Sequence, residues 1–146
     1  MAKPEIPPKI SPDLLDRLTK RFADFPLFQG WDLSIEALGP GTATLRVGSS
    51  EKVRNTVGNV HGGVQAALAD SACALALCTA FDGAMPFSTS DMHIRFLEPA
   101  SGPLLADAEI LRLSARSSVL ECRLRCAGQV VALCTAHFTL RSLKGN

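Results

Sequence analysis

The spacing of apolar positions divides the chain into helical and strand-like segments. In residues 11–22, SPDLLDRLTKRF, leucine and phenylalanine recur at helical spacing behind a Ser-Pro-Asp start, which predicts a short amphipathic helix. Apolar runs at about 31–38 and 42–48 are separated by a Gly-Pro-Gly break, which predicts a hairpin. We therefore expect residues 1–29 to be an N-terminal extension that contains the short helix.

The segment 61–81 differs from its surroundings because it is apolar on nearly every side. It is rich in alanine and leucine, which favour a helix, and it contains no glycine or proline after Gly63. A helix without a polar face must be buried on most sides. Its one carboxylate, Asp70, lies inside this apolar run, so that group must be paired, solvated in a cleft or used chemically.

Further strand-like runs follow the long helix, at about 87–97, 104–113, 118–126 and 129–140. In VLECRLRC, for example, leucine and cysteine alternate with charged residues and so share one face of a strand. One long helix and an antiparallel sheet of about six strands predict a single α+β domain over 1–146, with the last four strands in a meander. A sheet that wraps around the helix would explain the helix's apolar character.

Composition limits the expected compartment and partners. Hydrophobic residues make up 47% of the chain, as in folded proteins, and the net charge of +1 gives no general attraction to nucleic acid. The start, MAKPEIPPKISP, has no apolar signal core, and the longest apolar region is too short and too polar at its edges for a bilayer. We therefore expect a cytoplasmic protein with no membrane partner.

The five cysteines include no CxxC pair, so we expect structural thiols in a reduced compartment. A zinc site is not expected, because His61, His93 and His137 show no ligand spacing with these cysteines.

The start of the long helix carries the candidate chemistry. Its first backbone amides lack helical partners and the helix dipole makes this end partly positive. Gly62 and Gly63 have no Cβ, so these amides could hold a carbonyl oxygen that becomes negative during attack, or the glycines could only allow a tight turn. His61 could act as an acid, a base or a helix cap, and Asn55 could bind a ligand or form a turn. Asp70 could equally form an ion pair at a subunit interface.

Together these residues resemble a known family. An asparagine six residues before His-Gly-Gly and an aspartate nine residues after the histidine occur in NTVGNVHGGVQAALAD, and STSDMHIRFLEPA follows. This combination is similar to hotdog-fold acyl-CoA thioesterases of the phenylacetate-pathway and mammalian thioesterase-superfamily-member type, over about residues 30–140. The resemblance implies a hotdog fold, in which a curved antiparallel sheet wraps a long central helix. It also implies a homodimer with one continuous sheet, and dimers that often form a homotetramer.

The resemblance implies a role for each candidate residue, in a site between subunits. The Gly62 amide would polarise the thioester carbonyl, and Asp70 of the partner subunit would act as general base or as nucleophile. His61 and Asn55 would hold the loop and assist at the carbonyl, and Thr89 on the following strand would help to place the water.

Further residues are expected to bind the substrate. They are Gly63 beside the carbonyl, Ser90 beside Thr89, and Arg116 with Ser117 at the coenzyme tail, with Lys52 and Arg54 as other basic candidates. The family usually has glycine where Ala115 stands, so the loop around Arg116 departs from its pattern.

The expected activity is hydrolysis of a small aromatic or medium-chain acyl-CoA to the free acid and coenzyme A. One carboxylate and a set of hydrogen-bond donors suffice for this chemistry, without a metal or a bound cofactor. An alternative is a non-catalytic acyl-CoA-binding domain of the same fold. A hydratase or dehydratase is more distant, because the proline-rich histidine motif of those enzymes is absent.

Overall fold

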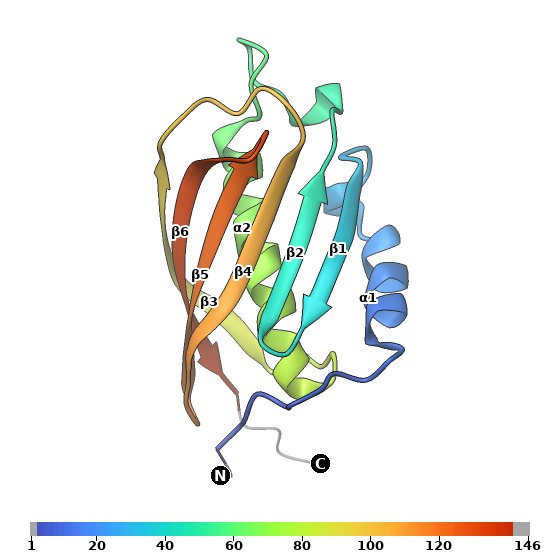
Figure 1. Ribbon diagram of the computed structural model, residues 1–146, viewed down its shortest axis with the longest axis vertical. Helices are drawn as coiled ribbons and strands as arrows, with labels where there is room; N and C mark the ends of the chain where they lie inside the picture. Colours follow the sequence, from blue (N-terminus) through green and yellow to red (C-terminus); the bar gives the residue numbers. More distant parts are fainter. Residues whose placement is uncertain (1–2, 142–146) are drawn as a thin grey trace.

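The computed structural model describes residues 3–141, in which a curved antiparallel sheet encloses one long helix (Figure 1). The helices are α1 (Leu14–Ala23) and α2 (Gly62–Cys78), and the single-turn 3-10 helices are η1 (Pro26–Phe28), η2 (Glu51–Val53) and η3 (Thr79–Phe81). The strands are β1 (Leu33–Gly39), β2 (Thr42–Val47), β3 (Phe87–Phe96), β4 (Leu104–Leu113), β5 (Ser117–Cys126) and β6 (Gln129–Leu140). This confirms the two helices, the six strands and the hotdog arrangement expected from the sequence.

The order of the strands corrects one expectation. The sheet runs β1-β2-β4-β5-β6-β3, with every neighbouring pair antiparallel. The predicted four-strand meander is therefore wrong for β3, which pairs with β6 at the edge of the sheet and not with β4. The reason is that α2 carries the chain from β2 to the far edge, and the connection 97–103 returns it, so that β4 pairs with β2 (Figure 1).

The apolar character of α2 is explained by its position against the concave face of the sheet. Leu68, Ala72, Leu75 and Leu77 are among its fully buried residues, and α2 contacts β4, β2 and β5. The stretch Gly62–Phe81 is long and apolar enough to span a membrane, contrary to the expectation that it is too short, but 61% of its most apolar window is buried within the fold. Burial in the protein core therefore accounts for its composition.

Helix α1 packs against the loop that follows α2. Leu14 and Leu18 are fully buried, which fits the predicted amphipathic helix. Asp82 in that loop accepts hydrogen bonds from Ser11 and Arg17, and these hold the pKa of its carboxyl below the ordinary value. The N-terminal extension is thus tied to the end of α2.

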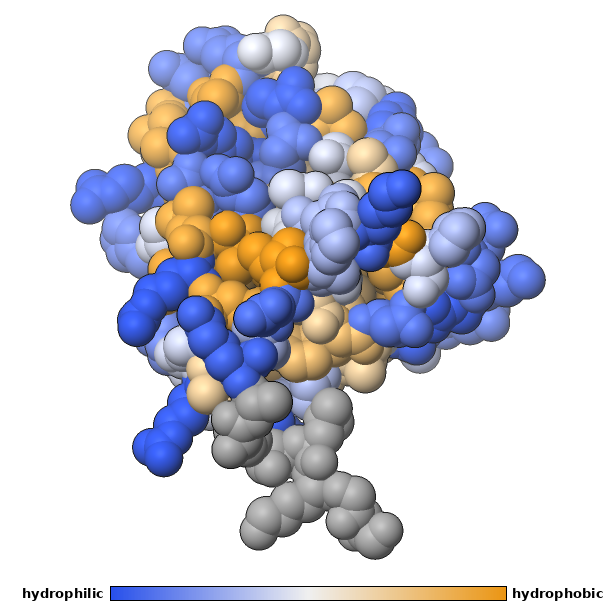
Figure 2. Space-filling view, turned by 60° about the horizontal axis from the view of Figure 1, so that its bottom comes forward, coloured by the Kyte–Doolittle hydropathy of each residue, from blue (hydrophilic) through white to orange (hydrophobic). Residues whose placement is uncertain are grey.

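The two ends of α2 face different surroundings. Figure 2 views the end of the molecule at which the β1–β2 hairpin lies, where apolar side chains gather in a patch enclosed by hydrophilic ones. The start of α2, with the candidate residues, lies at the opposite end in Figure 1.

Candidate active site

His61 forms the N-cap of α2. Its Nδ1 accepts a hydrogen bond of 2.9 Å from the Gly63 amide, so the ring proton lies on Nε2. A Cβ at Gly63 would lie 3.0 Å from that Nδ1, closer than side chains normally approach. The glycine therefore makes room for the imidazole, and its amide is occupied by the cap.

The Gly62 amide is the donor that the cap leaves available. Within residues 3–141 it has no hydrogen-bond acceptor. A Cβ at Gly62 would lie 3.4 Å from Cζ of Phe96, an ordinary contact. Gly62 borders an open cleft of about 380 Å³ at the start of the helix. The cleft is lined by Asn55, Asn59, Val60, Gly62, Gln65 and the segment 96–100.

Asn55 closes the turn that precedes α2. Its Oδ1 accepts hydrogen bonds from the amides of Val57, at 3.1 Å, and Asn59, at 3.0 Å. Because the side-chain oxygen is used in this way, Nδ2 is the group that remains for a ligand, and it can only donate. The turn role considered from the sequence is therefore present, and Nδ2 has no hydrogen-bond partner among residues 3–141.

Asp70 lies next to Thr89, from the edge strand β3. Thr89 Oγ1 donates a hydrogen bond of 2.6 Å to Asp70 Oδ1. The pairing of β3 with β6 shifts register between Thr89 and Asp91, so Ser90 is the extra residue of a β-bulge. Ser90 Oγ turns to β6 and donates to the carbonyl oxygen of His137 at 2.9 Å. Of the neighbouring hydroxyls, the structure thus brings Thr89 to the carboxylate and directs that of Ser90 away from it.

The candidate residues fall into two groups within one chain. One group is the cleft at the helix start, with Asn55 and Gly62, and the other is the Asp70–Thr89 pair. Gly62 and Asp70 are eight residues apart on α2, which corresponds to about 12 Å along a helix. One carbonyl carbon therefore cannot contact both groups of the same chain.

The basic candidates lie in different surroundings. The Arg54 side chain is only 14% exposed and donates to the carbonyl oxygens of Gly58 and Ser101, so it fixes the loops around the cleft. Lys52 is exposed on η2. Arg116 is exposed in the hairpin between β4 and β5, away from the cleft at the helix start.

Ser117 belongs to the same hairpin as Arg116. Its backbone oxygen accepts a hydrogen bond of 2.9 Å from Ser114 Oγ, and its amide donates to that hydroxyl at 3.2 Å. Leu140 donates to the carbonyl of Arg116, which joins this hairpin to the end of β6. Both residues are therefore closer in the sheet to Thr89, whose partner on β6 is Phe138, than to Gly62.

Sequence reasoning missed Gln65. Its side chain is only 5% exposed and lines the cleft one helical turn after Gly62. Nε2 donates to the carbonyl oxygen of Val60 at 3.1 Å, while Oε1 is buried without a hydrogen-bond partner in the part of the chain that the structure describes. The available signal was the same as for Asp70, a polar residue inside an apolar helix.

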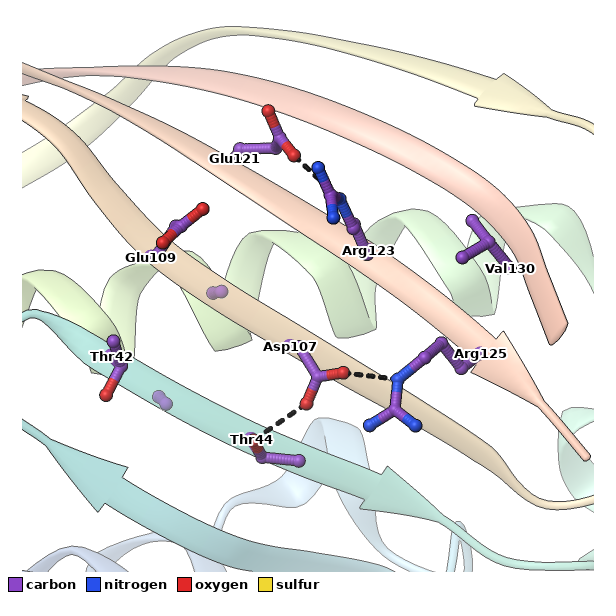
Figure 3. A pocket seen from close by; sticks show the side chains of 10 residues that line it. Thr42, Thr44, Asp107, Glu109, Glu121, Arg123, Arg125 and Val130 are labelled. Carbon is purple, nitrogen blue, oxygen red and sulfur yellow. Dashed lines mark hydrogen bonds and ion pairs between the residues drawn. The ribbon is translucent and has the colours of Figure 1, made fainter. Parts of the chain in front are cut away.

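A second hollow lies on the outer face of the sheet, with α2 behind it (Figure 3). There Asp107 accepts hydrogen bonds from Thr44, at 2.8 Å, and Arg125, at 2.6 Å. Burial raises the pKa of the Asp107 carboxyl, but these bonds and the Arg125 charge outweigh it and hold the pKa below its ordinary value. Four of its five charged groups are paired, as Asp107–Arg125 and Glu121–Arg123, so this hollow offers a weaker case for catalysis than the cleft.

The buried cysteines have the properties of structural thiols. Burial raises the pKa values of Cys78 and Cys134 to about 12, and a hydrogen bond with Cys73 together with burial also raises the pKa of Cys122. Such thiols are poor nucleophiles and poor ligands at neutral pH. Within residues 3–141, no group of three or more histidine, cysteine or acidic residues is placed to hold a metal ion.

Known proteins resemble the chain in sequence and in structure. Residues 57–133 match the family model described as the thioesterase superfamily. A protein of Halobacterium salinarum, named as a candidate esterase, is 35% identical over 103 residues, which are 67% of this chain and 68% of the relative.

Two solved structures extend the likeness to the fold. A mutant of the phenylacetic acid degradation protein PaaI from Thermus thermophilus is 28% identical, with a TM-score of 0.72 over 81% of this chain and 100% of that chain. The PaaI protein of the E. coli phenylacetic acid degradation operon is 20% identical and matches in fold, with a TM-score of 0.79 over 91% of this chain and 96% of that chain.

Proposed function

Because the chain belongs to the thioesterase superfamily and has the hotdog fold, we propose that it is an acyl-CoA thioesterase whose active site forms between two copies of the chain. The observation that carries the proposal is the division of the polar residues into two groups. The helix start offers donors for an oxyanion, and the Asp70–Thr89 pair offers a carboxylate.

The pairing of β3 supports a site shared between subunits. β3 is an edge strand of the sheet, and one side of it has no partner strand among the described residues. Thr89, near its start, contacts Asp70, while Phe96, at its end, lies beside Gly62. If two β3 strands pair antiparallel about a two-fold axis, the start of each lies next to the end of the other. Asp70 of one subunit then faces the Gly62 cleft of the partner.

The proposed reaction uses each group for one task. The thioester oxygen accepts hydrogen bonds from the Gly62 amide and Asn55 Nδ2, which stabilise the negative charge that develops on it. Asp70 takes a proton from water, whose oxygen bonds to the carbonyl carbon, and the C–S bond then breaks to release coenzyme A as the thiolate. Alternatively, Asp70 attacks the carbon itself, the C–S bond breaks to release coenzyme A as the thiolate, and water then hydrolyses the resulting mixed anhydride. Both routes require the carboxylate, and neither requires a metal or a cofactor.

The first test compares the wild type with Asp70→Asn on a panel of aromatic and medium-chain acyl-CoA thioesters. We expect the wild type to release coenzyme A and the variant to lose at least about a hundredfold in kcat. Free thiol is detected with a chromogenic disulfide. Equal rates for the two proteins would contradict the mechanism, and binding of acyl-CoA without hydrolysis would favour the non-catalytic alternative.

A mixing experiment tests whether the site is shared. Asn55→Asp keeps the oxygen that closes the turn but removes the Nδ2 donor, so we expect this variant to be nearly inactive, like Asp70→Asn. In a mixed dimer, one of the two sites combines the intact Asn55 of one chain with the intact Asp70 of the other. Random exchange between equal amounts of the two variants makes half of the dimers mixed, and each mixed dimer has one active site of two. It should therefore restore about a quarter of the wild-type activity. Failure of exchanged mixed dimers to regain activity would contradict a shared site.

The same proposal includes a small aromatic or medium-chain acyl group in the substrate. It also includes a homodimer that pairs into a homotetramer, and a cytoplasmic location. Sedimentation of the purified protein checks the assembly, because an active monomer is incompatible with the shared site.

A further inference from the structure

Gln65 is an unusual residue for the position that it occupies. It is the third residue after Gly62 on α2 and is only 5% exposed. It lines the same cleft as Gly62. Its Oε1 is the buried side-chain oxygen that lacks a hydrogen-bond partner among residues 3–141. Buried polar atoms are normally paired, because leaving an acceptor unpaired costs its lost hydration.

The orientation of the Gln65 amide is fixed by its other end. Nε2 donates to the carbonyl oxygen of Val60, just before the helix cap, at 3.1 Å. A flipped amide would place Oε1 against that carbonyl oxygen, two acceptors in contact, so the observed orientation is the favourable one. The Gln65 side chain therefore folds back beside the first turn of α2, and its Oε1 is buried in the wall of the cleft.

The residues that line the cleft then have a specific pattern of polar groups without a hydrogen-bond partner among residues 3–141. The Gly62 amide and Asn55 Nδ2 are donors, and Gln65 Oε1 is an acceptor. The two donors can hydrogen-bond to a carbonyl oxygen, whereas the acceptor requires an N–H or O–H group. A ligand that satisfies all three groups has a carbonyl oxygen and, a few bonds away, an N–H or O–H group.

We propose that Gln65 is a specificity residue of this cleft, whose Oε1 accepts a hydrogen bond from an N–H or O–H group of the bound thioester close to the reacting carbonyl. This inference rests on the proposed thioesterase function and adds to it a preference among thioesters. It gives the unpaired oxygen a partner that is present when substrate is bound.

Two parts of an acyl-CoA can supply such a donor. On the thiol side, the first amide N–H of the pantetheine arm is separated from the thioester sulfur by two carbons. On the acyl side, a hydroxyl on the third carbon lies at a similar separation from the carbonyl. Both present the same chemistry to Gln65, and paired substrates distinguish them.

The experiment measures kcat and KM for two substrate pairs that share the acyl chain that the wild type hydrolyses fastest. The first pair is the acyl-CoA and its 3-hydroxyacyl-CoA counterpart. The second pair is the acyl thioester of N-acetylcysteamine and that of 2-acetoxyethanethiol, in which an ester oxygen replaces the N–H group. Each pair is measured with the wild type and with Gln65→Met, which has a similar length and no acceptor oxygen.

In one pair we expect the wild type to prefer the member with the donor by roughly tenfold in kcat/KM, as is typical of one hydrogen bond. In Gln65→Met this preference should disappear, and the pair in which it disappears identifies the source of the donor. The control is Gln29→Met, because Gln29 also donates from Nε2 to a backbone carbonyl, that of Ala23, but lies on the surface outside the cleft. It should leave both preferences unchanged.

Several outcomes overturn the inference. A wild type that hydrolyses thioesters but shows no preference in either pair contradicts it, and this comparison needs no variant and so does not depend on the folding of Gln65→Met. An equal loss on all four substrates in Gln65→Met assigns the residue to structure alone. If the wild type hydrolyses no thioester, the proposed function itself fails, and the inference fails with it.

Discussion

Thr89 Oγ1 and Asp70 Oδ1, 2.6 Å apart, join the central helix to the edge strand of the sheet. Ser90 forms a β-bulge, so Thr89 and Asp91 have consecutive partners on β6, Phe138 and His137. Because Oδ1 accepts a hydrogen bond from a hydroxyl, the carboxylate has a defined orientation, and in the proposed reaction Oδ2 is the oxygen that acts on water or on the thioester. Asp70 is also only partly buried, so solvent and the Thr89 contact together accommodate a single charge in the most apolar helix of the chain.

Replacing Thr89 by valine should test that contact. Valine has nearly the same shape but no hydroxyl, so we expect kcat to fall roughly tenfold to a hundredfold, the usual value of a hydrogen bond to a charged group. Thr89→Ser keeps the hydroxyl and should retain most of the activity. Thioester hydrolysis and thermal unfolding are measured together. Unchanged kcat in Thr89→Val would show that the contact has no catalytic importance.

The two glycines at the start of α2 should respond differently to alanine. A Cβ at Gly63 would press on the His61 ring that caps the helix, whereas a Cβ at Gly62 would make an ordinary contact with Phe96. We expect Gly63→Ala to be less stable than Gly62→Ala by about 1 kcal/mol, the typical contribution of an N-cap. Urea unfolding gives the comparison.

The effect of Gly62→Ala on activity should be larger than its effect on stability. Gly62→Ala places a methyl group at the donor of the proposed oxyanion site and should reduce kcat even though it folds normally. A fully active Gly62→Ala protein would indicate that substrate does not approach this amide.

The thiols should react very unequally. Cys73, Cys78, Cys122 and Cys134 are buried, and only Cys126 is partly exposed. Since the pKa values of Cys78 and Cys134 are raised to about 12, we expect a thiol reagent at pH 8 to modify Cys126 first. Titration of the native and the denatured protein checks this. Rapid modification of several cysteines in the native protein would contradict the packing around α2.

The ion pair on the outer face of the sheet should contribute to acid sensitivity. The pKa of Asp107 is lower in the folded protein than its ordinary value of about 3.9. A lowered folded-state pKa means that the stabilisation is present above the unfolded-state value and is lost as the pH falls through the folded-state value. We therefore expect wild-type stability to decline below about pH 4.

Asp107→Asn provides the matched control for that decline, because its amide oxygen still accepts hydrogen bonds but does not titrate in this range. The variant should be less stable at neutral pH and should show a smaller drop in denaturation midpoint towards acid. The same pH slope in both proteins would assign the acid sensitivity to other carboxylates, such as Asp82.

The sequence determined most of the local structure, because local spacing encodes it directly. The Ser-Pro-Asp start of α1, the Gly-Pro-Gly turn between β1 and β2 and the alternation in β5 each depend on neighbours within one element. The apolar composition of α2 also required burial against a sheet. The His-Gly-Gly motif with Asn55 and Asp70 located the candidate site at residue level.

Only the tertiary structure decided what depends on contacts between distant segments. Strand spacing does not specify which strands pair, so the place of β3 beside β6 followed from the path of α2 across the sheet. Similarly, the unpaired oxygen of Gln65 exists because the Val60 carbonyl holds the other end of its amide. Hydrogen-bond pairing between side chains is fixed by packing in three dimensions, and no local pattern in the sequence records it.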